Sequence, residues 1–498
     1  MLRMMKLSIQ FFLIILFVLT SGCGATKHIT FPDPAPVTQK EILYDVNGNG
    51  ISDFALQADA QGNISILAYD EDEDGRYERI YNINDYANED VPHLIILLDS
   101  IPYQCVVDKY KSGHFSWFPP PQKVIAPFPS LTDVVYNRLL HVPPRAGTNN
   151  HFYDHRTNSM SSSYWNQMNG VKQPWERYLD YSTPFFTMGR GFMKPRQVYP
   201  DELEQIKQRL DQSPSRVTIV YDASSAGMVC KYGRQGAYEC LDGVERLCLQ
   251  LLWERQGAIK ISIMADHGHN LMKSKFISLQ DILNDAGFKV TDKIESKTDI
   301  VIDAEGLCTY AGIHTREPSR VADVLLKLPQ TELVLYMAGD RVIVRDARGT
   351  AAIEKKGGKL RYIPIDSDVL SYQSVIEALT KSGKIDVEGF ASDDDWFEAT
   401  VDHEWPDAPS RIWNAFHGTV VCTPDLMVSI LDGFYNGFTL FESFIDMASI
   451  HGGLNQINSA TFLLSMTGRA NRPLRSREVL KTIEPDYVPA VKCNTDSD

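Results

Sequence analysis

The sequence predicts an α/β protein with a largely parallel central sheet flanked by helices. Apolar runs of strand length recur from Pro92 onward and alternate with stretches of helical spacing. The clearest runs, Leu94–Leu98, Val217–Tyr221 and Ile259–Met264, are rich in apolar and β-branched residues, as expected of strands buried on both faces. The chain of 498 residues is 43% hydrophobic and is therefore long enough and apolar enough to bury a large core.

The net charge of the chain argues against nucleic acid as a partner. The sequence contains 49 lysine and arginine residues against 64 aspartate and glutamate residues, which gives a net charge of −15 at pH 7. It has no stripe of basic residues interleaved with aromatic residues, the pattern that binds a phosphate backbone. We therefore expect no binding to a nucleic-acid backbone.

Residues 1–22 are typical of an export signal. Arg3 and Lys6 precede an apolar run, 11–19, that is too short for a permanent transmembrane helix. The segment Leu19-Thr20-Ser21-Gly22-Cys23 resembles a bacterial lipobox, in which the cysteine carries lipid and becomes the first mature residue. This resemblance implies an exported lipoprotein of the cell envelope that is anchored to the membrane through Cys23. Cleavage and release is the alternative.

Two similar acidic loops, 45–53 and 70–78, follow a tether at 23–40 and form an internal repeat. Each loop has oxygen-bearing side chains at positions 1, 3, 5 and 9 and glycine at position 6, which favours a hard cation such as Ca²⁺. The stretch 64–69 between the loops alternates like a strand, so we expect calcium-binding β-hairpins within 41–90, with solvated turns as the alternative. The predicted calcium ligands are Asp45, Asn47, Asn49 and Asp53 in the first loop and Asp70, Asp72, Asp74 and Glu78 in the second.

Helices are expected between the strands, and a smaller lobe is expected beside the main sheet. The stretches 202–210 and 239–253 carry apolar residues at helical spacing. Two strand-like runs, 333–337 and 341–346, are joined by a turn and predict a hairpin. We therefore divide the rest of the chain into a core (91–305 and 411–475), an inserted α+β lobe (306–410) and a C-terminal tail (476–498).

Polar side chains follow the three clearest strands at the point where each strand ends. Asp99, Asp222 and the pair Asp266-His267 occupy these places. Ligands of parallel α/β sheets gather at the carboxyl ends of the strands, and two carboxylates with one imidazole suit a divalent transition metal. Taken singly, each aspartate also fits a helix cap or a turn.

Four features of the sequence occur in a recognisable order. Asp99 follows a buried strand, and Phe128-Pro129-Ser130-Leu131-Thr132, Ala265-Asp266-His267-Gly268 and His451-Gly452-Gly453-Leu454 come after it. Together they resemble the alkaline phosphatase superfamily, in particular its type I phosphodiesterase and nucleotide-pyrophosphatase-like branch. The resemblance covers about 92–468 and implies an alkaline-phosphatase-like fold, a two-zinc site and a threonine or serine nucleophile.

Matched position by position, the resemblance implies that Asp99, Asp266 and His267 hold one metal ion and that Thr132 is the nucleophile. A helix is predicted directly after Thr132, and the N–H groups at its N-terminus could bind a phosphate. A plain helix N-cap is the alternative interpretation of this threonine.

The second metal position departs from the family pattern. Ala226 and Cys230 occupy the places of an aspartate and a histidine ligand, so His451 is the only family ligand retained there. Cys230 and His451 would form an incomplete site, which Asp222 could complete, although Asp222 also fits an ordinary turn. His269 is expected to contact the metal ligands without binding the metal itself.

The predicted function is metal-dependent hydrolysis of phosphomonoesters or phosphodiesters by an enzyme attached to the cell envelope. One or two ions of Zn²⁺ or another divalent transition metal would serve the reaction, and Ca²⁺ would bind the N-terminal loops. Two alternatives stay open at this point. The protein could be a catalytically inactive family member that acts as an envelope binding protein, or a calcium-dependent surface adhesion module.

Overall fold

The structure is a computed structural model that describes residues 28–35, 38, 40–88, 91–162, 167, 169, 171–303, 308–437 and 447–492. The predicted signal peptide and the predicted lipidation site, Cys23, lie outside the described residues. Within the described part of the chain, no helix has the length and apolar character needed to cross a bilayer.

The central sheet has seven strands in the order β23-β6-β22-β11-β5-β10-β9. The three strands predicted from the sequence are adjacent and parallel, with β5 between β10 and β11. Only β22 runs antiparallel to its neighbours, β11 and β6. The seven strands are β5 (His93–Leu98), β6 (Gln122–Ile125), β9 (Tyr181–Ser182), β10 (Val217–Asp222), β11 (Lys260–Ala265), β22 (Ala460–Ser465) and β23 (Leu474–Arg475).

Helices cover both faces of this sheet because its strands are apolar on both sides. Alternate residues of β5 face opposite sides of the sheet. Leu94, Ile96 and Leu98 pack in the core formed with α2, α6 and α7, and Ile95 and Leu97 pack in the core formed with α3 and α14. The predicted helical stretches lie inside α6 and α7. These helices are α2 (Tyr103–Lys111), α3 (Thr132–Leu139), α6 (Pro195–Gln212), α7 (Ser224–Glu254, broken at Gly233) and α14 (Ser476–Ile483), and α5 (Phe185–Met193) precedes α6.

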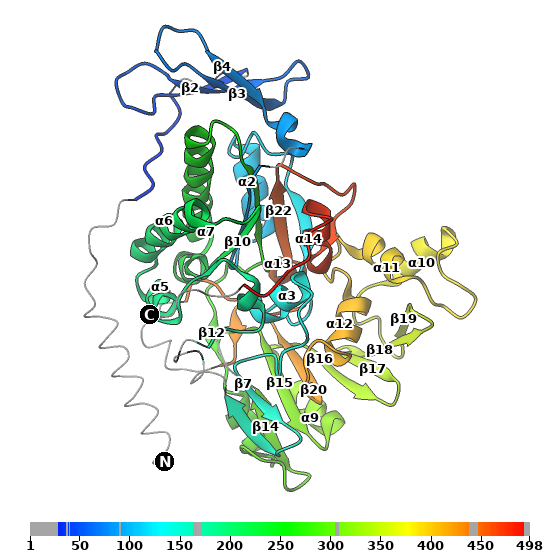
Figure 1. The fold of residues 1–498 in the computed structure, drawn as a ribbon. Helices are drawn as coiled ribbons and strands as arrows, with labels where there is room; N and C mark the ends of the chain where they lie inside the picture. The colour runs from blue at the N-terminus through cyan, green and yellow to red at the C-terminus, as the bar shows by residue number, and fades with distance from the viewer. Residues whose placement is uncertain are drawn as a thin grey trace.

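Residues 41–82 form a separate four-stranded antiparallel sheet at one end of the molecule (Figure 1). Loop 45–53 connects its first two strands and loop 70–78 connects its last two, so each acidic loop closes a hairpin. The sheet packs on the C-terminal part of α7, where the Tyr69 hydroxyl donates to the Leu252 carbonyl at 2.7 Å. Its elements are β1 (Glu41–Tyr44), β2 (Phe54–Ala58), β3 (Ile64–Tyr69), β4 (Arg79–Asn82) and the short helix η1 (Ile83–Asn88).

A second large sheet lies at the opposite end of the molecule (Figure 1), with strand order β13-β14-β15-β20-β16-β17-β18-β19. The predicted hairpin is its β16–β17 pair. Helices α8 and α9 pack on one part of this sheet, and α10, α11 and α12 pack on another. The strands are β13 (Lys289–Val290), β14 (Asp299–Asp303), β15 (Tyr310–Thr315), β16 (Thr331–Ala338), β17 (Arg341–Asp346), β18 (Gly349–Lys356), β19 (Lys359–Pro364) and β20 (Leu426–Ile430).

The predicted lobe boundaries, 306–410, are too narrow for this sheet. Strands β13 and β14 precede residue 306, and β20 follows residue 410 and lies between β15 and β16. Local sequence does not reveal which sheet a strand joins, because that choice depends on long-range pairing.

The remaining elements are η2 (Trp175–Tyr178), α8 (Leu279–Asp285), α9 (Pro318–Leu325), α10 (Gln373–Lys381), α11 (Asp393–Thr400), α12 (Ala408–Phe416), α13 (Gln456–Ser459), and the strand pairs β7 (His151–Asp154) with β8 (Ser159–Ser162) and β12 (Lys275–Phe276) with β21 (Phe434–Tyr435).

Candidate metal and catalytic site

The structure brings four of the predicted site residues together at the carboxyl ends of β5 and β11. Asp99, Asp266 and His267 each offer a ligand atom within 4.8 Å of the others. The Thr132 hydroxyl lies 3.4 Å from Asp99 Oδ2 and 3.5 Å from His267 Nε2. The arrangement follows from the topology, because parallel neighbouring strands present the residues after their last positions at the same edge of the sheet.

Thr132 is the first residue of α3 and does not act as its cap. Leu131 occupies the N-cap position, and no side chain accepts a hydrogen bond there. The alternative interpretation of Thr132 as an N-cap is therefore wrong, and its hydroxyl is directed to Asp99 and His267 instead. The first N–H groups of an α-helix have no intrahelical acceptor, so α3 presents donors for an anion beside this hydroxyl.

Asp99 is held in place by two hydroxyl groups that sequence reasoning did not identify. Ser100 Oγ donates to Asp99 Oδ1 at 2.6 Å, and the Tyr221 hydroxyl donates to Asp99 Oδ2 at 2.5 Å. Burial, together with the Asp99 carboxylate, raises the pKa of Tyr221 well above its ordinary value, so this phenol remains a donor. The only available signal was that Tyr221 lies next to the end of the neighbouring strand.

Asp266 has one satisfied and one unsatisfied carboxylate oxygen. Its Oδ1 accepts hydrogen bonds from the backbone N–H groups of Ser100 and His267 at 3.0 and 2.8 Å. Its Oδ2 is buried without a hydrogen-bond partner. Burial, reinforced by the nearby Asp99 carboxylate, raises the pKa of Asp266 well above its ordinary value. A buried oxygen of this kind is costly unless a further group binds it.

His267 presents a lone pair to the same space. Its Nδ1 donates to the Gly268 carbonyl at 2.9 Å, which leaves Nε2 as the acceptor nitrogen. Burial lowers the pKa of His267, so the imidazole is neutral. Nε2 lies 3.2 Å from Asp266 Oδ2. While Asp266 is ionised, both atoms are acceptors and no proton lies between them, so their lone pairs repel.

These donors fit a divalent transition metal. Two carboxylates and a neutral imidazole are a common zinc ligand set, and in the described part of the chain neither Asp99 nor Asp266 forms an ion pair with lysine or arginine. Ligand atoms around one tetrahedral zinc lie roughly 3.4 Å apart. The 3.2 Å between Asp266 Oδ2 and His267 Nε2 already matches this spacing, and the other separations are at most 4.8 Å. The orphaned Asp266 oxygen is the strongest single sign that a cation belongs here.

The predicted second metal position is not assembled in the same way. The His451 ring stacks on the His267 ring with centroids 4.0 Å apart, and its Nδ1 donates to the Ser130 carbonyl at 2.9 Å. Cys230 Sγ lies 3.8 Å from His269 Nε2 instead of joining His451. Burial raises the pKa of the Cys230 thiol. In the described part of the chain, neither Cys230 nor His451 belongs to a cluster of metal-ligand atoms.

Asp222 does not replace the missing ligand. It is fully buried, and its Oδ1 and Oδ2 accept the backbone N–H groups of Ser224 and Ser225 at 2.9 and 3.1 Å. The carboxylate therefore closes the turn that begins α7, as the alternative interpretation of this residue expects. Ala226 follows in the first turn of α7, where it offers no ligand.

In both acidic loops, backbone N–H groups donate to the aspartate at the first position, an arrangement that suits both a cation-binding loop and a plain turn. Asp45 accepts N–H groups from Gly48 and Gly50, both at 2.7 Å, and Asp70 accepts that of Gly75 at 2.9 Å. The amide groups of Asn47 and Asn49 in the first loop both donate to Glu73 in the second, so the two loops lie side by side. Ligand atoms of the second loop, on Asp70, Asp72, Asp74 and Glu78, lie within 4.8 Å of one another.

Several solved structures have a similar overall chain path. Phosphonoacetate hydrolase from Sinorhizobium meliloti 1021, in complex with phosphonoformate, is 11% identical with a TM-score of 0.41, over 84% of this chain and 97% of that one. Murine ectonucleotide pyrophosphatase / phosphodiesterase 5 is 10% identical with a TM-score of 0.45, over 82% and 97%. The human protein of that name is 11% identical with a TM-score of 0.43, over 78% and 92%. No protein-family model and no curated protein matches the chain.

Proposed function

We propose that the protein is a metal-dependent hydrolase of phosphomonoesters or phosphodiesters of the alkaline phosphatase superfamily, with Thr132 as its nucleophile. One observation carries the proposal. The Thr132 hydroxyl lies at the N-terminus of α3 and within 3.5 Å of Asp99 and His267, which together with Asp266 form a ligand set for a cation. A nucleophile, a set of anion donors and a metal position therefore share one small space.

The side chains of the site have distinct roles in this proposal. Asp99, Asp266 and His267 would hold Zn²⁺ or a related ion, which supplies Lewis-acid stabilisation of negative charge. The N–H groups at the start of α3 bind the phosphoryl oxygens, and Asp99 Oδ2, 3.4 Å from Thr132 Oγ1, accepts its proton. Tyr221 and Ser100 position the Asp99 carboxylate.

The reaction would proceed in two displacements at phosphorus. Thr132 Oγ1 forms a bond to phosphorus while the ester bond breaks, and the departing oxygen takes up the proton that Thr132 gave to Asp99 and leaves as an alcohol. The oxygen of a water molecule then displaces Thr132 Oγ1 from phosphorus, one water proton returns to Thr132 Oγ1, and phosphate or a phosphomonoester is released. The covalent intermediate is the most specific consequence of assigning the nucleophile to Thr132.

A second candidate function is a non-catalytic binding protein that retains the metal and anion position. The observation in its favour is the altered second metal position, where Ala226 provides no ligand and Cys230 lies beside His269 as a buried thiol. Losing the second ion would remove several kcal/mol of transition-state stabilisation by the usual magnitude of such effects, roughly a loss of a thousandfold or more in rate. The proposal therefore expects slow turnover.

The N-terminal features complete the proposed function. We propose that Cys23 carries lipid and anchors the protein in the cell envelope, on the basis of the signal-like segment before it. Loops 45–53 and 70–78 are proposed calcium sites that stiffen the two hairpins, because their oxygen spacing suits a hard cation. Surface adhesion through these loops is the alternative role.

The test is hydrolysis of an aryl phosphate monoester and an aryl phosphodiester by purified protein reconstituted with zinc, manganese or magnesium. Wild-type activity should require metal and vanish in Thr132→Ala, whereas Thr132→Ser should retain part of it. Combining Ala226→Asp with Cys230→His should increase the rate by restoring ligands of the second position. Metal binding without any turnover would favour the binding protein, and full activity in Thr132→Ala would refute the nucleophile.

A further inference from the structure

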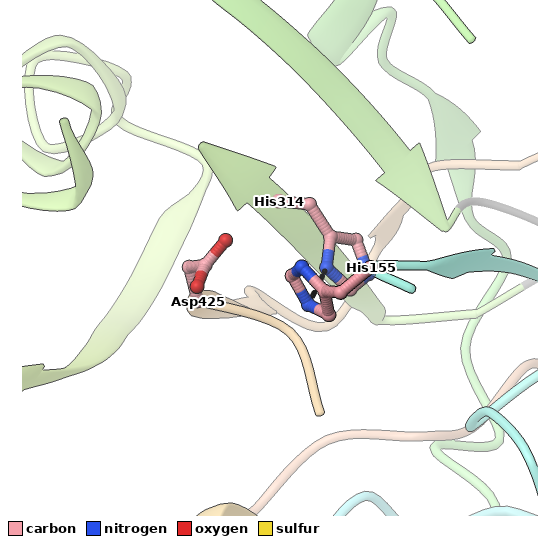
Figure 2. A group of neighbouring side chains, drawn as sticks. All are labelled: His155, His314 and Asp425. Carbon is pink, nitrogen blue, oxygen red and sulfur yellow. Dashed lines mark hydrogen bonds between the residues drawn. The ribbon is translucent and has the colours of Figure 1, made fainter. Parts of the chain in front are cut away.

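A second cluster of metal-binding residue types lies in the lobe built on the second large sheet. His155 is in the turn between β7 and β8, His314 is on β15, and Asp425 immediately precedes β20. Figure 2 shows the two imidazoles side by side with the carboxylate next to them. One ligand atom of each residue lies within 4.8 Å of the other two. The proposed hydrolase uses none of these residues.

The hydrogen bonds of His314 fix which of its nitrogens can bind an ion. Its Nε2 lies 2.8 Å from Oδ2 of Asp303, a fully buried carboxylate whose Oδ1 accepts the Tyr153 N–H at 2.9 Å. Nε2 is therefore protonated and donates to Asp303, so the lone pair of His314 is on Nδ1. A carboxylate that orients the far nitrogen of a histidine is the usual support of a histidine metal ligand.

The lone pair on His314 Nδ1 faces the other histidine. His314 Nδ1 lies 3.1 Å from His155 Nε2, which is also 3.4 Å from the Thr423 carbonyl. Without an ion, the Nε2 proton of His155 can satisfy both acceptors. His155 is exposed, so it can adopt the other tautomer at little cost and present a second lone pair.

The charges around the two imidazoles favour a cation. In the described part of the chain, neither Asp303 nor Asp425 forms an ion pair with lysine or arginine. Asp425 Oδ2 accepts the Thr315 N–H at 2.9 Å, which keeps the carboxylate in place and leaves Oδ1 available. Two carboxylates therefore adjoin two imidazoles, and within the described residues neither carboxylate is neutralised by an ion pair with lysine or arginine.

We propose that His155 Nε2, His314 Nδ1 and a carboxylate oxygen of Asp425 bind a divalent transition cation of the Zn²⁺ type. Two imidazoles and one carboxylate suit zinc, cobalt or iron(II) better than calcium or magnesium. Because His155 is exposed, water can complete the coordination. The ion would attach the β7–β8 hairpin to β15 and to the start of β20, segments that are far apart in the sequence.

This cation site is tested separately from the catalytic site by starting from the double variant Asp99→Asn and Asp266→Asn, in which the candidate catalytic metal position is removed. Zinc binding to this background is measured by equilibrium dialysis in buffer containing saturating calcium, and the visible spectrum of bound cobalt reports its coordination. We expect one tight zinc ion per chain and a cobalt spectrum typical of four or five ligands.

Adding His155→Ala to the background should abolish that ion, and adding Asp425→Asn should weaken it strongly. Asp303→Asn, which acts through His314, should lower the affinity by about 10- to 100-fold. The matched control is His417→Ala, because His417 is exposed, stacks on Trp413 with ring centroids 4.0 Å apart and lies outside the cluster. This control should bind zinc like the background.

Hydrogen exchange provides an independent readout. Zinc should slow amide exchange in 151–162 in the background and leave it unchanged in the background with His155→Ala. The proposal is overturned if the background binds no zinc, if His155→Ala binds it equally well, or if only His417→Ala loses it. Any of those results would mean that Asp303, His314 and His155 form only a hydrogen-bonded chain.

Discussion

Replacing Asp266 by asparagine should stabilise the metal-free protein and destabilise the zinc-bound protein. In the wild type, Asp266 Oδ2 is buried without a donor, and it lies 3.2 Å from His267 Nε2, which carries no proton. An asparagine would keep Oδ1 on the N–H groups of Ser100 and His267. Its Nδ2 would then donate to His267 Nε2 at any pH, whereas the wild type can form this hydrogen bond only while Asp266 is protonated.

The expected size of this effect follows from the geometry. Two carboxylate charges with atoms at most 4.8 Å apart repel by at least about 3.5 kcal/mol at an effective dielectric constant of about 20, and a new buried hydrogen bond adds about 1 kcal/mol. The wild type avoids part of the repulsion because Asp266, with its raised pKa, can hold a proton. We therefore expect the metal-free variant to gain about 1–3 kcal/mol.

The assay is urea unfolding in buffer with calcium and either a zinc-selective chelator or saturating zinc. Zinc at about 100 times its dissociation constant should stabilise the wild type by about 2.7 kcal/mol, and most of this gain should be absent in Asp266→Asn. The matched comparison is Asp99→Asn, which disturbs the hydrogen bonds from Ser100 and Tyr221 and should destabilise even the metal-free protein. A metal-free Asp266→Asn protein that is less stable than the wild type, with an unchanged zinc response, would refute this reasoning.

Three further predictions concern the stability of the protein. Gly268→Ala should lower the melting temperature and the soluble yield sharply, because its Cβ would lie 2.0 Å from the Ile457 carbonyl oxygen, whereas Gly189→Ala, which meets nothing within 4 Å, should be tolerated. Glu484→Gln should make the free energy of unfolding less dependent on pH in acid. Burial by itself raises the pKa of Glu484, but hydrogen bonds from His93 and Arg216 lower it to about 2, so the wild type should lose about 1–2 kcal/mol of stability as the pH falls from about 4.5 toward 2. An equal loss in both proteins would contradict this prediction. Calcium should raise the melting temperature of the wild type but not that of the double variant Asp45→Ala and Asp70→Ala, and an equal response of both would mean that the loops are only turns.

The sequence was most informative about the central sheet. Strands buried on both faces read as continuous apolar runs, so β5, β10 and β11 and the polar residues at their ends could be located in advance. Asp99, Asp266, His267 and Thr132 meet in the structure as expected. The strand pattern therefore located the three candidate metal ligands, whereas Thr132 was assigned through the resemblance to a known family.

What the sequence could not provide depends on contacts between distant residues. Spacing alone did not decide between Asp222 as a ligand and Asp222 as a cap, and only the positions of Ser224 and Ser225 decided it. The support of Asp99 by Tyr221 and the insertion of β20 between β15 and β16 arise from tertiary pairing. His155 and His314 are 159 residues apart, and no local pattern connects them.

In the proposed mechanism, Thr132 attacks phosphorus within a metal-dependent site. The most direct measurement is mass spectrometry of zinc-loaded protein that has been quenched in acid during turnover of an aryl phosphate ester. We predict a phosphorylated peptide carrying the modification on Thr132, absent from the zinc-depleted protein and from Thr132→Ala. Turnover by the wild type without phosphorylated Thr132, or turnover that persists in Thr132→Ala, would contradict the account.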